Sequence, residues 1–371
     1  MRAAKGIGIL LIAAMLGGCT DQKVLEKIGF TRTIFIDSAD GDKDKINVTI
    51  SIPKTNQSES IVYSNVARTF KQAKVYFDMQ NDRRVVLGQL RQILFGGNLA
   101  RKGVWPHLES IFRDPSVGIR THVILLEGDI DKLSTRKYTQ GGTMGEYLDN
   151  LVRTDPTSRG VYDTSIHTFL RDYYDDGIEP LANIIKGTAN GLMVDGVALF
   201  VGDRYVAKVP SDDAMYFAML RANLKYGTLV MEEVDTAKES VPASLSNVVS
   251  KRSIRIKSVP DRRSGKPAEA VLELKIRGSL LEYYGHESLN VAANQRSLEV
   301  AMEKYVGGRC ERLIRLMQAA HSDAIGFGQR VRNKMDYQSW KRLNWSEEFP
   351  RADIKVSIDL DIKDFGSLAE S

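Results

Sequence analysis

Three segments in the last third of the chain alternate apolar and polar residues with a period of two: residues 254–257, 272–277 and 354–363. Successive side chains of a β-strand point to opposite faces of the sheet, so each segment predicts a strand with one apolar and one charged face. Strands of this kind pair in antiparallel sheets that are wet on one side and covered on the other. We therefore expect the carboxyl-terminal part of the chain to be an antiparallel sheet covered by a helix.

The covering helix is predicted from about residue 297 to residue 320, because apolar residues recur there at helical spacing. The residues available for its inner face are Leu298, Ala301, Tyr305, Leu313, Leu316 and Met317. Gly307 and Gly308 weaken the middle of this helix by up to about 1 kcal/mol each, and a break or a kink would fall at this point. Cys310 lies in the same helical pattern and is interpreted as a small hydrophobic residue.

The chain as a whole divides into three regions of mixed α/β character, so the predicted fold class is α+β. Residues 19–190 alternate strands with helices after an early hairpin and predict an N-terminal α+β domain. Residues 191–247 predict a small middle β-β-α-β domain, which would also fit as a lobe of either neighbour. Its polar end, residues 236–247, contains a proline and is interpreted as a linker. Residues 248–371 are the predicted C-terminal α+β domain.

One helix of the N-terminal domain can be placed more closely. Ser64 is a residue type that caps helices. Phe70, Ala73 and Phe77 follow it at helical spacing, together with Val66, and are expected to form the inner face of that helix.

Residues 1–18 predict an export signal peptide. Arg2 and Lys5 form a positive head, and residues 6–16 carry no charge. As a helix this run would extend about 16 Å, whereas the hydrocarbon core of a bilayer is about 30 Å thick. The run is therefore too short for a typical transmembrane helix. No later stretch approaches the roughly twenty apolar residues that such a helix requires.

The end of this signal, Leu16-Gly17-Gly18-Cys19, resembles the bacterial lipobox. The resemblance implies cleavage before Cys19, diacylglycerol on the Cys19 thiol and acylation of the new amino terminus. An ordinary cleaved signal with a chance cysteine, or an uncleaved anchor, remains the alternative. Two or three acyl chains hold a membrane durably where one does not. With Cys19 lipidated, Cys310 is the remaining cysteine of the chain and no intrachain disulfide can form.

The charge pattern argues against nucleic acid as a partner. The net charge is +5, and two of these charges belong to the signal peptide. The basic residues of the remaining chain are dispersed among acidic ones rather than gathered in a dense block. Such a body has solvated charged faces and some attraction to anionic lipid headgroups.

A search for catalytic, cofactor and metal sites gives none. The five histidines are scattered, and none has a metal-binding spacing: His107, His122, His167, His286 and His321. No nucleophile elbow is present. The Gly265-Lys266-Pro267 segment lacks the rest of a P-loop, and Gly326-Phe327-Gly328 is better explained by a tight turn and a helix start. The acidic segment 37–44 does not match an EF-hand and favours a hairpin turn. We expect no enzyme activity.

Several landmarks, in order along nearly the whole chain, resemble the Ger(x)C family, the lipoprotein C subunits of nutrient germinant receptors in spore-forming bacteria. They are the lipobox with the strand 28–37, residues 91–103 with Phe112-Arg-Asp-Pro115 and Arg120, residues 196–201, Asp323-Ala-Ile-Gly-Phe-Gly-Gln329, and Trp340 with Trp345-Ser-Glu-Glu-Phe-Pro350. This sequence departs from the family pattern at Gln329, where a glutamate is usual, at Gln89-Leu90, where Ser-His is common, and after Cys19, where Trp-Asp is usual.

The resemblance implies three α+β domains tied by acylated Cys19 to the outer face of the spore inner membrane. It implies two membrane-protein partners, an A subunit with large soluble portions and a transporter-like B subunit, and a non-catalytic role in receptor assembly or signalling. No catalytic, cofactor or metal residue is carried over from the family.

Two other functional classes fit the sequence less well. A solute-binding lipoprotein of an uptake system needs two α/β lobes around a ligand cleft. A lipid-anchored hydrolase has no support from the motif search.

Overall fold

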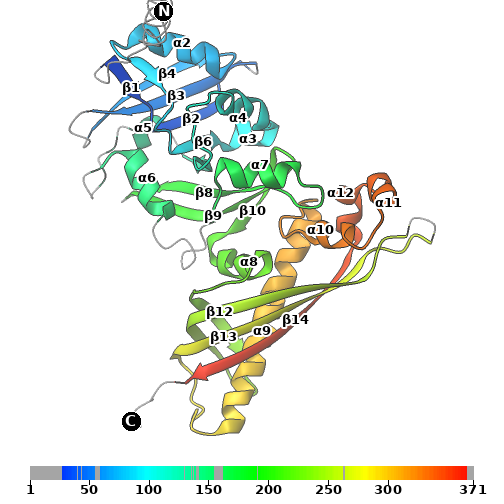
Figure 1. Ribbon diagram of the computed structural model, residues 1–371. Helices are drawn as coiled ribbons and strands as arrows, with labels where there is room; N and C mark the ends of the chain where they lie inside the picture. The colour runs from blue at the N-terminus through cyan, green and yellow to red at the C-terminus, as the bar shows by residue number, and fades with distance from the viewer. Residues whose placement is uncertain are drawn as a thin grey trace, which may run out of the picture.

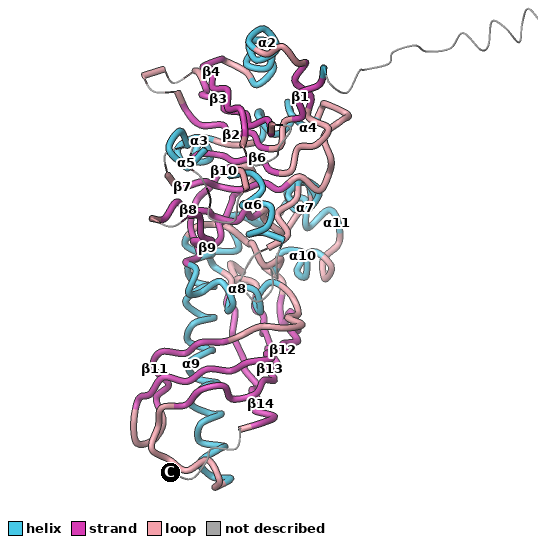
Figure 2. Tube along the Cα trace, turned by 90° about the vertical axis from the view of Figure 1, so that its left-hand side faces the viewer, coloured by secondary structure: helices cyan, strands magenta, loops and turns pink. Residues whose placement is uncertain are grey.

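The computed structural model describes residues 27–365 except for 40, 43, 55–58, 129, 135, 137, 139–141, 154–161, 190 and 262–263. The described chain forms two units that follow one another along an elongated body (Figures 1 and 2). The first is built around an eight-stranded sheet and the second around a four-stranded sheet. Within the described chain, no helix is both long and apolar enough to span a membrane.

The eight-stranded sheet has the order β10-β9-β8-β7-β6-β2-β3-β4. Its four central strands are parallel: β2 (Thr33–Ser38), β6 (Gln92–Gly96), β7 (His122–Glu127) and β8 (Leu181–Thr188). Antiparallel strands extend it on both sides: β3 (Ile46–Pro53), β4 (Ser60–Ala67), β9 (Gly191–Val201) and β10 (Arg204–Pro210). The acidic segment 37–44 connects β2 and β3, which confirms the predicted hairpin. A separate pair of short parallel strands consists of β1 (Ile28–Phe30) and β5 (Arg84–Val86).

Helices cover both faces of this sheet because its central strands are apolar on both sides. In β2, Ile34 and Ile36 belong to one core and Phe35 to the other. The first core is shared with α2 (Phe70–Gln80), α3 (Gly97–Lys102), α4 (Trp105–Phe112) and α7 (Ile166–Tyr174). The second core is shared with α5 (Ile130–Ser134) and α6 (Met144–Arg153).

The second unit has the strand order β11-β12-β13-β14. These strands are β11 (Leu229–Asp235), β12 (Ser240–Ser258), β13 (Glu269–Tyr283) and β14 (Asp353–Asp364). The long helix α9 (Ala292–Ala319) lies along one face of the sheet (Figure 1). The other face carries charged side chains, such as Lys275 beside Asp359 at 3.8 Å and Arg277 beside Asp361 at 3.6 Å. The predicted helix-covered sheet with one wet face is therefore confirmed.

The pairing of the last strand differs from the sequence prediction. β12 is antiparallel to β11 and β13, but β14 is parallel to β13. The reason is the connection between them, because the chain leaves β13, crosses the sheet in α9 and returns in the same direction. Short helices complete this return: α10 (Phe327–Arg332), α11 (Tyr337–Arg342), α12 (Trp345–Glu348) and η3 (Phe349–Arg351).

Residues 191–247, predicted as a middle unit, do not form a sheet of their own. β9 and β10 extend the eight-stranded sheet, whereas β11 pairs with β12 in the four-stranded sheet. Between them lie η2 (Ser211–Asp213) and α8 (Ala214–Arg221). The predicted linker is also wrong, since most of it forms the start of β12. Pro242 is tolerated there because it lies at an irregularity of the β11–β12 ladder, between Val241 and Ala243, where no ladder N–H is required.

The predicted helix cap at Ser64 is also corrected. Ser64 lies within β4, and the cap of α2 is Thr69, whose side chain accepts a hydrogen bond from the Gln72 N–H at 3.2 Å. Phe70, Ala73 and Phe77 are buried on the inner face of this helix as expected. Val66 is not part of that face, because it lies in β4 and is 51% exposed.

Gly307 and Gly308 do not interrupt α9, which runs as one helix of 28 residues. A Cβ on Gly308 would meet no atom within 4 Å, and Gly308 is not among the residues with positive φ. Gly308→Ala should therefore raise the free energy of unfolding by about 0.5–1 kcal/mol, because alanine loses less backbone entropy in a helix. Urea unfolding of the two proteins tests this, and a lower stability of the variant would contradict it.

Candidate functional site

Most of the residues singled out in the sequence are dispersed in the fold. Cys19 lies outside the described residues, so its acylation stays a prediction. Within the described part of the chain, no group of three or more His, Cys, Asp or Glu side chains could hold a metal ion. Cys310 is buried in α9 as a free cysteine, as expected, and burial raises its pKa to about 12. It is therefore a thiol at neutral pH rather than a nucleophilic thiolate.

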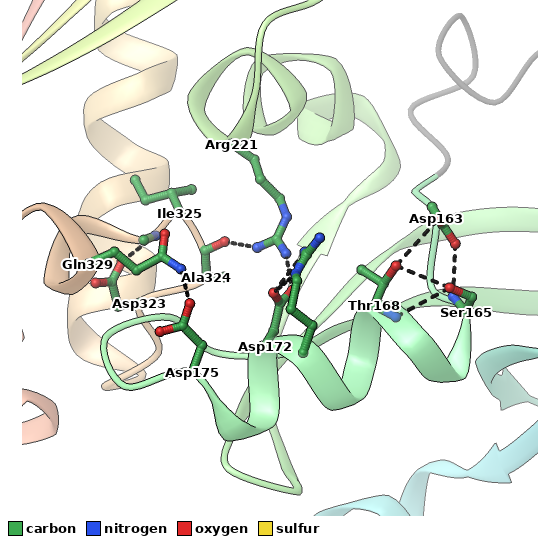
Figure 3. Close-up of polar contacts among 12 residues, drawn as sticks. Asp163, Ser165, Thr168, Asp172, Asp175, Arg221, Asp323, Ala324, Ile325 and Gln329 are labelled. Atoms are coloured by element: carbon green, nitrogen blue, oxygen red, sulfur yellow. Dashed lines mark hydrogen bonds and ion pairs between the residues drawn. The ribbon is translucent and has the colours of Figure 1, made fainter. Parts of the chain in front are cut away.

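An extended polar network lies where the two units meet. We call it the junction and define it as α7, the loop 175–180, the end of α8, Arg252 and the segment 322–332. One hydrophobic core continues through this region, since Leu181 and Leu199 of the eight-stranded sheet belong to the same cluster as residues of α8, α9 and the four-stranded sheet. Figure 3 shows Asp172 of α7 facing Arg221, and Asp175, which follows α7, facing Gln329 of the segment after α9.

Asp323 organises the segment that follows α9. Its Oδ1 accepts hydrogen bonds from the backbone N–H groups of Gly326 at 2.9 Å and Phe327 at 3.0 Å. Its Oδ2 accepts from the N–H of Gly328 at 2.6 Å and from Trp345 Nε1–H at 2.8 Å. Gly326 has a φ of 76°, which glycine adopts without steric cost. The tight turn and helix start predicted at residues 326–328 are thus confirmed, and Asp323 fixes them.

Arg221 joins α8 to both sides of the junction. Its guanidinium forms an ion pair with Asp172 Oδ2 of α7 and also donates a hydrogen bond to the carbonyl of Ala324. Asp172 is 2% exposed and pairs in addition with Arg171 at 2.8 Å. The ion pair is therefore buried and links the helix layer of the first unit to the second.

Arg252 of β12 makes a comparable set of contacts with carbonyl groups. Its Nη2 donates to the carbonyl of Ile325 at 3.0 Å, and its Nη1 donates to the carbonyls of Leu220 and Arg221 at the end of α8. Burial lowers the pKa of Arg252 to about 10, so the guanidinium remains charged at neutral pH. A cation is favourable here because the carbonyls at a helix C-terminus carry partial negative charge.

Two glycines allow the backbones of the units to touch. A Cβ on Gly177 would lie 2.5 Å from the carbonyl carbon of Gly328. The Gln329 N–H donates to the carbonyl of Gly177 at 3.0 Å, and Gln329 Nε2–H donates to Asp175 Oδ2 at 2.6 Å. Arg332 completes the contact with an ion pair to Asp175 at 2.6 Å. Gln329, which departs from the family pattern, is thus part of the junction.

The junction holds two units in a fixed arrangement and shows no catalytic arrangement. The carboxylates of Asp172, Asp175 and Asp323 bind other side chains or backbone groups, as do the guanidinium groups of Arg221 and Arg252. None of these contacts pairs a nucleophile with a base. The junction can transmit a displacement of one unit to the other, because the polar network and the continuous core resist motion of the two units relative to each other. No sequence motif marks the junction, because side chains that contact each other in it lie up to 157 residues apart in the sequence.

The junction also predicts a dependence of stability on pH. Burial, together with the nearby charge of Asp323, raises the pKa of Glu179 from 4.5 to about 7, against the opposing effect of the Gly202 N–H, which donates to Glu179 at 2.7 Å. A raised folded-state pKa contributes stability that is complete below about pH 4.5 and is lost as the pH rises through about 7. Burial also raises the pKa of Asp323, so its contribution to stability likewise decreases as the pH rises.

We therefore expect the free energy of unfolding to fall between about pH 4.5 and pH 7, and the fall to be smaller in Glu179→Gln. Urea unfolding at several pH values measures this. A variant whose pH profile equals that of the wild type would contradict the assignment to Glu179.

A concave region of about 600 Å³ lies at the start of β6 and β7. Its lining includes Arg91, Arg120, His122 and Asp149. Asp149 is paired with Arg91, and burial lowers the pKa of His122, whose Nδ1 has no hydrogen-bond partner. Ser165, which also lines the region, is hydrogen-bonded to Thr168 at 3.1 Å rather than to a histidine. The arrangement could receive a small anion but does not resemble a nucleophilic site.

Comparison with known proteins identifies related chains over the whole length. The family model described as spore germination protein N-terminal domain matches residues 21–187, and the model described as spore germination B3/GerAC-like, C-terminal, matches residues 195–366.

Individual relatives cover almost the entire chain. Spore germination protein GerQC of Bacillus cereus is 22% identical and covers 96% of this chain and 97% of its own. Spore germination protein B3 of Bacillus subtilis (strain 168) is 20% identical over the full length of both chains. The crystal structure of the GerBC protein superimposes with a TM-score of 0.53 at 15% identity and covers 92% of this chain and 100% of that one. The likeness to GerBC shows a shared fold.

Proposed function

The chain belongs to the Ger(x)C family of spore germination proteins, and on that premise we propose that it is a lipid-anchored, non-catalytic subunit of a nutrient germinant receptor. Its role in spore germination follows from the family. The anchor, the partners and the location are the proposal, and the observation that carries it is the sequence Leu16-Gly17-Gly18-Cys19 ahead of a large folded body.

In this proposal acylated Cys19 ties the body to the outer face of the spore inner membrane. The partners are a membrane-embedded A subunit with large soluble portions and a transporter-like B subunit, and the protein contributes to receptor assembly or signalling. The junction supports a transmitting role, because two units joined by a buried ion pair and a continuous core move together. No cofactor is part of this function.

The solute-binding alternative has less support. A binding protein of an uptake system closes two α/β lobes around its ligand, which requires a hinge between them. The second unit here is a sheet backed by a single long helix, and the polar network at the junction opposes hinge motion.

The experiment that tests the proposal is metabolic labelling with a palmitate analogue in a spore-forming host. The wild-type chain should be labelled and should fractionate with membranes, and Cys19→Ala should lose both properties because the acyl chains provide the attachment. Cys310→Ala is the matched control, since Cys310 is buried in α9 and should not influence labelling. Labelling of Cys19→Ala would contradict the proposal.

A further inference from the structure

The outer face of α2 carries three exposed large apolar side chains. Val75, Tyr76 and Met79 are 51%, 39% and 76% exposed, although the opposite face of the same helix buries Phe70 and Phe77. At 3.6 residues per turn the three exposed residues fall within about a third of the circumference of the helix, so they form one contiguous strip.

Exposed basic residues accompany this strip along the chain. Lys71 is exposed on the same side of α2, and Arg68 and Arg84 are exposed just before and just after the helix. In the segment 68–84 there are five basic residues and two acidic ones. An apolar strip edged by cations is the pattern of a surface that lies against anionic lipid headgroups.

The first strand of the described chain lies beside the end of α2. β1 begins at Ile28, and a Cβ on Gly29 would lie 3.3 Å from Asn81, the residue that ends α2, and 3.6 Å from Arg83. The amino-terminal end of the described chain therefore lies against the end of α2, far from α9 and the four-stranded sheet (Figure 1).

The distance from the anchor is short. Cys19 and Lys27 are eight positions apart in the sequence. Eight residues extend over at most about 28 Å, so an anchor at Cys19 keeps the end of the body that carries α2 within this distance of the headgroups. A tether of this length gives a weak contact a high effective concentration, so the strip does not need strong affinity of its own.

We propose that the outer face of α2, formed by Val75, Tyr76 and Met79 with Lys71, Arg68 and Arg84 around it, rests on the surface of an anionic lipid membrane. The contact orients the elongated body, with the four-stranded sheet directed away from the bilayer. The inference rests on the proposed anchor at Cys19, which brings this face to the membrane.

The test uses a fluorescent label at two matched sites. Val75 and Val300 both lie in helices and are 51% and 49% exposed, but Val300 belongs to α9. The full chain, acylated at Cys19, is prepared as Val75→Cys and as Val300→Cys, labelled with an environment-sensitive dye and reconstituted in vesicles of phosphatidylethanolamine and phosphatidylglycerol. Cys310 is buried and Cys19 is blocked by its lipid, so the dye reports the introduced thiol.

The label at position 75 should shift to shorter emission wavelength on vesicles and be quenched by lipids with brominated chains, at least about threefold more than the label at position 300. Equal quenching at the two sites on vesicle-bound protein would overturn the proposal. In vesicles of phosphatidylcholine alone the quenching at position 75 should fall, and unchanged quenching would contradict the role of the basic residues. Failure of the anchor is a separate result, because the chain would then not remain on the vesicles and Cys19 itself would take up the dye.

Discussion

Replacing Asp323 by alanine should lower the free energy of unfolding by about 3–5 kcal/mol, because a buried charged acceptor then leaves its donors without partners. The Asp323 side chain is 2% exposed and accepts four hydrogen bonds, three from the backbone of residues 326–328 and one from Trp345. Urea unfolding of the purified chain measures the loss.

Two further variants test whether the loss of stability in Asp323→Ala comes from the hydrogen-bond network. The alternative is that any aspartate that caps a helix would give the same loss. Trp345→Phe keeps the ring but removes one of the four donors, and should cost about 1–2 kcal/mol. Asp336→Ala removes an exposed cap, whose carboxylate accepts from the Ser339 N–H at 3.0 Å, and should cost much less than Asp323→Ala. If Asp323→Ala costs no more than Asp336→Ala, the carboxylate does not organise the junction.

Replacing Arg221 by methionine should also cost about 3–5 kcal/mol, because removal of one member of a buried ion pair leaves the other charge uncompensated. Asp172 would keep only its contact with Arg171, whose side chain is 55% exposed. The carbonyl of Ala324 would lose its donor at the same time. Methionine retains much of the volume of the arginine stem, so the loss reports the charged contacts rather than a cavity.

The matched control for this variant is Arg315→Met on α9. Arg315 is 64% exposed and lies 3.6 Å from Glu311, so its removal should change the stability by less than about 0.5 kcal/mol. Limited proteolysis provides a second readout, since Arg221→Met should expose the chain around residues 175–180 to cleavage. Equal stability of the two arginine variants would show that the pair does not join the units.

The elements with a clear local period could be predicted from the sequence. The alternating strands of the last third, the covering helix and the inner face of α2 all follow from side-chain spacing, which depends only on backbone geometry. The continuous helix at Gly307 and Gly308 was less predictable, because packing of α9 on the sheet offsets the weak propensity of glycine.

Pairing between distant segments could not be read from local patterns. The direction of β14 depends on the path of the chain through α9, and the assignment of β9, β10 and β11 to two different sheets depends on which edges are available. Residues 236–247 were predicted to be a linker because they are polar. Most of them instead belong to β12, which pairs with β11 on one side and with β13 on the other.

The junction had only a partial signal in the sequence. Asp323 precedes a Gly-Phe-Gly turn, a spacing typical of a capping carboxylate, and Trp345 stands among the family landmarks. Nothing local connects these residues to Asp172, Asp175 or Arg221, which approach them only after both units have folded.

The most direct test of the proposed receptor role is germination of spores that lack this chain, followed as dipicolinate release. Spores of the deletion strain should lose the response to the nutrients that its receptor recognises and should still germinate with a non-nutrient trigger. A copy of the wild-type gene should restore the nutrient response. Deletion spores that respond to every nutrient as the parent does would contradict the proposal that this chain is a required receptor subunit.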